Sequence, residues 1–126
     1  MRNELLYLAN ILEAIEAIER FTLGHDESRF LADDLIQSAV LQKLSIIGEA
    51  AARLSEKTRT QAPDISWKEI IGFRNIAVHA YFSVDWRIVF VTVTDDLPAL
   101  KKSIVVQLEQ SKSMLVAQGK PGQLIS

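Results

Sequence analysis

The chain has 126 residues, a formal net charge of −2 and no cysteine. This length fits one domain with its own core, and an apolar content of 48% is too high for a disordered chain. The lack of cysteine excludes a disulfide framework, a thiolate metal site and a cysteine nucleophile. A slightly acidic chain is also unsuited to coating nucleic acid, so any such contact has to be local.

The amino-terminal segment argues against export and against a membrane anchor. Its first twenty residues carry four glutamates among apolar residues, which is not the pattern of a secretory signal peptide. No uncharged apolar run approaches the roughly 20 residues that a membrane helix requires. We therefore expect a soluble, cytoplasmic protein with no membrane contact.

The predicted elements in the first half of the chain are helices. Residues 3–22 repeat apolar side chains at intervals of three and four, and Gly24 is expected to end this helix in the left-handed conformation. A short helix is predicted at residues 28–33 and one long helix at residues 34–60. Within the long helix, Gly48 and the neighbouring alanines would allow another helix to approach closely.

Two more helices are predicted in the second half. Ser66 is expected to cap a helix over residues 67–79, and Glu69 three residues later would complete a capping box. Asp85 is a suitable cap for the last helix. Residues 88–94 have strand propensity, but apolar residues keep helical spacing over more than twenty positions, so we predict helix.

The carboxyl-terminal part contains one expected irregularity. Pro98 should kink or restart the last helix, with Asp95 or Asp96 as a local cap. Residues 117–126 are expected to form a flexible tail. Residues 1–116 would then be a single all-α domain, an up-and-down bundle of about four to five helices.

Four polar residues gather in the otherwise apolar segment 74–81: Arg74, Asn75, His79 and Tyr81. Asn75 and His79 are four apart and lie on nearly one helix face, and the long side chain of Arg74 can reach the same groove. Histidine can act as base or acid near neutral pH, and arginine can hold two phosphate oxygens. These residues suit metal-free RNA cleavage, or else a structural polar pair at a helix end.

Several other residues have more than one interpretation. Glu49 either pairs with Arg53 one helical turn later or helps to orient Arg74 or His79. Asn75 is expected to orient His79 or a phosphate, and Tyr81 either stacks on a base or covers the edge of the core. His25 is expected to be a solvated loop residue. With two histidines in the chain, a His-rich metal centre is excluded within one chain, and no metal or cofactor is expected.

A small group of basic residues could make local contacts with RNA, although acidic neighbours partly offset their positive charge. The basic candidates are Lys57, Arg59, Lys68 and Arg74, and the acidic neighbours are Glu56, Asp64 and Glu69. One histidine cannot easily act as both base and acid on opposite sides of an in-line displacement. A homodimer with two copies of the motif would supply both groups.

The spacing Arg74-x-x-x-x-His79-x-Tyr81 resembles the signature of HepT-like toxins, which are small helical domains of the HEPN superfamily. Further segments resemble that family in the same order, at residues 21–24, 30–33, 46–50, 67–72 and 84–85. The resemblance extends over about residues 3–110. It therefore rests on a motif together with ordered flanking sequence.

The resemblance implies an endoribonuclease toxin of a type II- or type VII-like toxin–antitoxin pair, with Arg74 and His79 as catalytic residues at a homodimer cleft. It also implies a partner, a minimal nucleotidyltransferase antitoxin of the MNT type, which transfers AMP to Tyr81. One alternative is a non-catalytic HEPN module that binds nucleotide or RNA as the partner subunit of a nucleotidyltransferase. The other is a purely structural helical dimer.

Overall fold

The computed structural model describes the backbone of residues 2–79 and 81–119 and the side chains of residues 4–76 and 82–113. Over these ranges the ordered elements are helical, which confirms the predicted all-α class. In chain order they are α1 (Arg2–Thr22), α2 (Glu27–Leu31), α3 (Asp34–Arg53), α4 (Glu56–Thr60), α5 (Trp67–His79), η1 (Tyr81–Ser83), α6 (Trp86–Val91), the π-helical η2 (Thr92–Asp96) and α7 (Leu97–Gly119). None of the described helices is both long and apolar enough to cross a bilayer.

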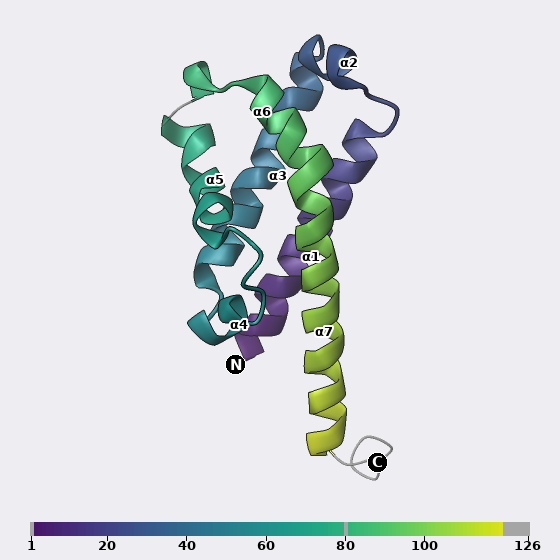
Figure 1. Ribbon diagram of the computed structural model, residues 1–126, viewed down its shortest axis with the longest axis vertical. Coiled ribbons are helices and arrows are strands. Elements are labelled where there is room, and N and C mark those ends of the chain that lie inside the picture. Colours follow the sequence, from purple (N-terminus) through teal and green to yellow (C-terminus); the bar gives the residue numbers. More distant parts are fainter. Residues whose placement is uncertain (1, 80, 120–126) are drawn as a thin grey trace.

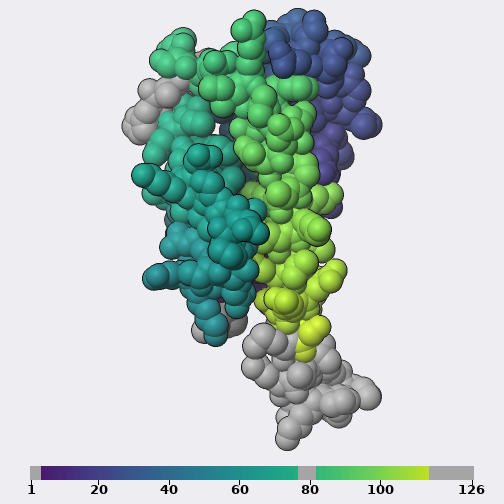
Figure 2. Space-filling view, in the orientation of Figure 1, coloured from purple at the N-terminus to yellow at the C-terminus, as the bar shows by residue number. Residues whose placement is uncertain are grey.

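The long helices lie side by side as a bundle (Figure 1). Helix α3 packs against α1 on one side and α5 on the other, and α1 also packs against α7. In the space-filling view, the segment from α4 to α5 lies beside α7 (Figure 2). The side-chain amide of Gln107 on α7 connects these two parts, donating a hydrogen bond of 2.8 Å to the carbonyl of Thr58 on α4.

The core lies between α1, α3 and α7 and follows from the apolar spacing of these helices. Their fully buried side chains include Ile11, Ile15, Ile18, Val40, Leu44, Ile47, Leu100 and Ile104. Phe30 of α2 covers one end of this core and packs against the rings of Trp86 and Phe90, with centroid distances of 6.5 and 5.5 Å. Each such side chain contributes about 1.5–3 kcal/mol through burial, which holds in place the α3 helix on which α5 packs.

The contact between α3 and α5 is unusually close at Gly48. A Cβ atom added to Gly48 would lie 2.6 Å from the backbone nitrogen of Arg74 and 2.9 and 3.0 Å from the carbonyl oxygens of Ile70 and Ile71. The predicted close helix approach at this glycine is therefore confirmed. It brings the backbone of Arg74 directly against α3, beside Glu49.

The single helix predicted over residues 34–60 is wrong, because the chain breaks after Arg53. Ser55 has an extended backbone and caps α4, accepting a hydrogen bond of 3.1 Å from the backbone N–H of Thr58. Glu4 of α1 stabilises the break from across the bundle. Its carboxylate accepts the Ser55 N–H at 2.8 Å and the Thr58 hydroxyl at 2.6 Å.

The last helix differs from expectation in how it accommodates Pro98. Asp85 caps α6 as predicted, accepting the Arg87 N–H at 3.0 Å. The helix then continues without the cap and restart expected at Asp95 or Asp96. It widens into the π turn η2, in which the Leu97 N–H donates to the carbonyl of Thr92, five residues earlier. This turn ends directly before Pro98, which has no N–H to donate.

The ends of the other predicted helices agree with the structure to within a few residues. Gly24 has the expected positive φ of 77° after α1, and α5 spans the predicted residues 67–79. Helix α7 continues to Gly119, past the expected start of a tail at residue 117. Residues 120–126 lie outside the described ranges, so the flexible tail stays a prediction.

We expect Gly48→Ala to lower the free energy of unfolding by about 1–3 kcal/mol, because its Cβ would collide with backbone atoms of α5 that cannot rotate away. Gly72→Ala is the matched control. It also adds a methyl group to a helical glycine, but nothing lies within 4 Å of the new Cβ. This variant should gain about 0.5–1 kcal/mol. Urea unfolding at equal protein concentration measures both values, and equal effects of the two substitutions would contradict the close-contact argument.

Candidate functional site

Helix α5 carries the polar segment, and Trp67 secures its first turn. The indole N–H of Trp67 donates to the carbonyl oxygens of Arg59 at 2.9 Å and Ala62 at 3.1 Å. Ile70, one turn later, is buried in the core at 5% exposure. These contacts hold the apolar side of α5 against α3, while the side chains of Arg74 and Asn75 stay exposed.

Arg74 and Asn75 line an open depression of about 530 Å³ between α5 and α3. The α3 wall consists of Ser45, Ile46 and Glu49. The structure therefore brings together three of the predicted site residues: Arg74, Asn75 and Glu49. Ser45 and Ile46 were not singled out from sequence, since only the packing of α3 on α5 places them there.

Glu49 lies within ion-pair distance of both Arg53 and Arg74. One carboxylate oxygen lies 3.1 Å from a guanidinium nitrogen of Arg53, as the spacing of four residues predicts. The other oxygen lies 3.7 Å from a guanidinium nitrogen of Arg74 on the facing helix. All three side chains are about half exposed, so each pair is a surface ion pair of modest strength.

The polar donors of the depression are largely available to a ligand. The distance from Arg74 to Glu49 exceeds hydrogen-bond length, and among the described residues the guanidinium has no other partner. Within that same part of the chain, the Asn75 side-chain amide has no hydrogen bond. An arginine fork and an amide beside each other can bind the oxygens of a phosphate group.

His79 and Tyr81, the other two residues of the motif, have side chains outside the described residues. The backbone of α5 is helical without interruption from Trp67 to His79, so the spacing of one helical turn between Asn75 and His79 is confirmed. The roles assigned to the His79 imidazole and the Tyr81 phenol stay predictions. Around the described side chains, no group of three His, Cys, Asp or Glu residues is arranged to hold a metal ion.

Comparison with known proteins matches residues 11–106 to the family described as Ribonuclease HepT-like. The chain belongs to the HepT-like family. It is 43% identical over 95 residues to a probable ribonuclease HepT of Thermococcus cleftensis, an alignment covering 75% of this chain and 86% of the relative. A Methanocaldococcus jannaschii protein named as a putative RNase is 35% identical over 100 residues, covering 79% of this chain and 92% of the relative. No solved structure matches the chain.

A third relative shows the same segment within a longer protein. This Methanocaldococcus jannaschii protein is named as a gamma-glutamylcyclotransferase and putative RNase, and it is 37% identical over 105 residues. The alignment covers 83% of this HepT-like chain but 47% of the relative. The resemblance drawn from the Arg74, His79 and Tyr81 spacing is thus confirmed at the level of the family.

His25 of the HepT-like chain is not the solvated residue that the sequence suggested. Its side chain is 14% exposed, and Nε2 lies 3.2 Å from the carboxylate of Asp33, the residue that caps α3. The backbone N–H of Ile36 and then the His25 ring hydrogen-bond this carboxylate and hold its pKa below the ordinary value of 3.8. His25 therefore ties the loop after α1 to the start of α3.

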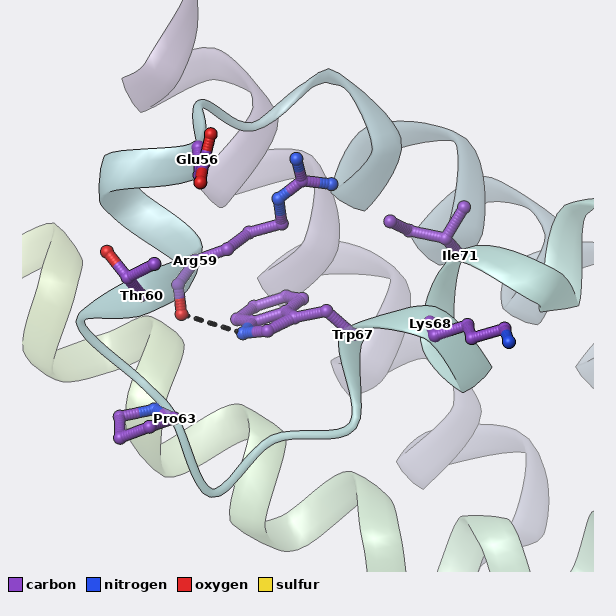
Figure 3. Close-up of a pocket in the computed structure, with 7 residues that line it drawn as sticks. All are labelled: Glu56, Arg59, Thr60, Pro63, Trp67, Lys68 and Ile71. Carbon is purple, nitrogen blue, oxygen red and sulfur yellow. Dashed lines mark hydrogen bonds between the residues drawn. The ribbon is translucent and has the colours of Figure 1, made fainter.

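A second hollow of about 560 Å³ lies at the other end of α5, between α4, the following loop and the first turns of α5 (Figure 3). Its lining residues are Glu56, Arg59, Thr60, Pro63, Trp67, Lys68 and Ile71. We refer to it as the Trp67 pocket. The sequence indicated Arg59 and Lys68 as basic candidates but did not single out Trp67. The signal in the sequence that could have indicated this pocket is an aromatic residue, Trp67, with Arg59 before it and Lys68 after it.

Proposed function

We propose that this HepT-like protein is a cytoplasmic endoribonuclease toxin that cleaves RNA without a metal ion. The observation that carries the proposal is the open depression in which Arg74 and Asn75 present polar donors beside Glu49. The family supports the same class of activity, because the relatives are named as ribonucleases. Arg74 and the motif position His79 are the proposed catalytic residues, supported by Asn75 and Glu49.

The proposed reaction needs a base, an acid and a cation. The base removes the proton of a ribose 2′-OH, and this oxygen attacks the adjacent phosphorus. The acid protonates the 5′-oxygen as its bond to phosphorus breaks, which leaves a 2′,3′-cyclic phosphate and a free 5′-OH. His79 would move a proton, Arg74 would stabilise the charge on the phosphate oxygens, and the Asn75 amide would orient the phosphate or the imidazole.

Glu49 would act as a positioning residue for Arg74. Its carboxylate is shared between Arg53 and Arg74, so the three charges sum to one positive charge at the rim of the depression. The longer contact, 3.7 Å to Arg74, is the weaker one and leaves that guanidinium free to turn toward a phosphate. Since all three side chains are exposed, this exchange carries a small energetic cost.

RNA cleavage by the unmodified protein in EDTA is the test of the proposed function. Wild type should yield products with 2′,3′-cyclic phosphate ends. His79→Ala should lower the rate by about 10²–10⁴-fold and Arg74→Ala by about 10²–10³-fold. Glu49→Gln should have a smaller effect, because it removes an orienting charge and leaves both proposed catalytic groups.

The control for this experiment is Arg20→Ala, which removes an equally charged, exposed arginine from α1. It should cleave like wild type, and circular dichroism should show all variants folded. An intact-mass spectrum establishes that no adenylate is attached before the assay. If clean wild type leaves several RNAs intact, the nuclease is refuted and the non-catalytic HEPN partner subunit, which only binds RNA or nucleotide, is the better function.

The proposed active form is a two-fold homodimer with the Arg74 and His79 faces of two α5 helices opposite each other. Acid and base then come from two histidines on opposite sides of the phosphate. Ile46, 39% exposed at the edge of the depression, adds apolar area to this face. Such a dimer would present the same patch from both chains.

We expect a dimer in a dilution series followed by light scattering, persisting at micromolar concentration. Glu49→Lys, which places a third cation between Arg53 and Arg74, should weaken the dimer, whereas Arg20→Glu on α1 should leave it intact. A monomer at every concentration, with cleavage retained, would refute the shared site.

Regulation would come from an MNT-type nucleotidyltransferase antitoxin that modifies Tyr81. In the proposed step the Tyr81 hydroxyl oxygen attacks the α-phosphorus of ATP, pyrophosphate leaves and the phenolic proton passes to a base. The resulting adenylate is bulky and anionic, and it lies two residues after His79 in the chain. It would fill the groove and repel the phosphates of RNA.

Incubation with such a transferase and ATP should add one AMP to the intact mass and abolish RNA cleavage. The sequence offers a matched pair of variants, because Tyr7 and Tyr81 are its two tyrosines. Tyr81→Phe should show no mass gain, whereas Tyr7→Phe should gain the same mass as wild type. An unchanged mass of wild type with an active transferase would refute the modification.

A further inference from the structure

The Trp67 pocket has an aromatic wall whose position is held by hydrogen bonds. The indole N–H of Trp67 is engaged by the carbonyls of Arg59 and Ala62 at the pocket edge, as the close-up shows for Arg59 (Figure 3). The ring remains half-buried and lines the hollow together with Pro63 and Ile71. A ring held in this way offers a flat apolar surface without the entropic cost of ordering it on binding.

Two cations accompany this apolar surface. Arg59 extends from α4 across the pocket toward α5, and Lys68 projects from the first turn of α5 (Figure 3). No acidic side chain among the described residues forms an ion pair with either of them. Glu56 at the rim reduces the local charge to one positive charge, and its carboxylate can accept a hydrogen bond from the amino group of a base.

The Trp67 pocket and the Arg74 depression lie along the same helix. Lys68, Ile71 and Asn75 follow one another at spacings of three and four, so they share one side of α5. Ile71 belongs to the pocket and Asn75 to the depression. These two residues are separated by about 6 Å along the helix axis, one turn of α5. A single extended strand can therefore contact both hollows.

We propose that the Trp67 pocket is a binding subsite for single-stranded RNA. A base flanking the cleaved bond stacks on Trp67, while Arg59 and Lys68 hold the adjacent phosphates. Aromatic stacking accepts any base, and unpaired cations beside it favour a polyanion over an apolar peptide. The inference rests on the proposed function, because it extends the RNA path from the Arg74 depression toward α4.

The test uses full-length protein carrying His79→Ala, to prevent cleavage, and Trp86→Phe, which leaves Trp67 as the one tryptophan. Tryptophan emission is measured with an unlabelled oligoadenylate 12-mer. Anisotropy is measured with the same 12-mer carrying fluorescein. The 12-mer should quench Trp67 emission as it binds. Adding Arg59→Gln and Lys68→Gln should weaken its affinity about ten-fold and reduce the dependence of binding on salt concentration.

The matched control is Arg20→Gln with Lys102→Gln, which removes the same charge from exposed positions on α1 and α7. It should bind the 12-mer within about two-fold of the parent. If Arg59 and Lys68 acted through unspecific attraction alone, the two double substitutions would lower the affinity equally. Arg59 and Lys68 are substituted instead of Trp67 because the Trp67 N–H also supports the α4 loop. A folded Trp67→Phe protein, which keeps a ring, should retain most of the affinity.

Unchanged Trp67 emission on binding, or equal losses in the two charge pairs, would overturn the subsite. If wild type still cleaves RNA in that case, the proposed function stands and the Trp67 pocket takes no part in RNA binding. If wild type neither binds nor cleaves RNA, both proposals fall together. The cleavage assay thus separates failure of the subsite from failure of the nuclease.

Discussion

The missing side chain of Gly48 determines where the polar segment lies. At this position the backbone of α5 rests directly on α3, with the Arg74 nitrogen 2.6 Å from where a Cβ of residue 48 would lie. Because backbone atoms make the contact, the origin of the Arg74 side chain relative to Glu49 does not depend on rotamers. Only the ends of the two side chains remain adjustable, and these ends form the 3.7 Å ion pair. A rigid base with mobile tips suits the proposed exchange, in which Arg74 leaves the Glu49 carboxylate for a phosphate of the RNA.

The sequence predicted those helices that are stabilised by nearby capping residues or by one long apolar face. The bounds of α5, the capping role of Asp85 and the left-handed Gly24 all followed from patterns within a few residues. The break at Ser55 did not, since the residues on both sides of it favour helix. The backbone N–H of Ser55 donates to Glu4, 51 positions earlier in the chain, and a local sequence pattern cannot predict a partner at that distance.

The same distinction explains what could be predicted of the site. The pair between Glu49 and Arg53 is visible from a spacing of four, whereas its contact with Arg74 requires the packing of two helices. His25 was misjudged for the equivalent reason, because its partner Asp33 becomes a neighbour only when the chain folds back at α2. The family motif indicated Arg74 as a site residue without describing any of these contacts.

Helix α4 depends on both distant ends of the domain. Glu4 of α1 holds its first turn, and Gln107 of α7 donates to its Thr58 carbonyl. Five residues cannot sustain a helix alone, so α4 can order only after α1 and α7 have met around it. The wall that it supplies to the Trp67 pocket is then among the last parts of the fold to form. It should also be among the first to open in the native state, and amide hydrogen exchange in α4 would be faster than in α1 or α3.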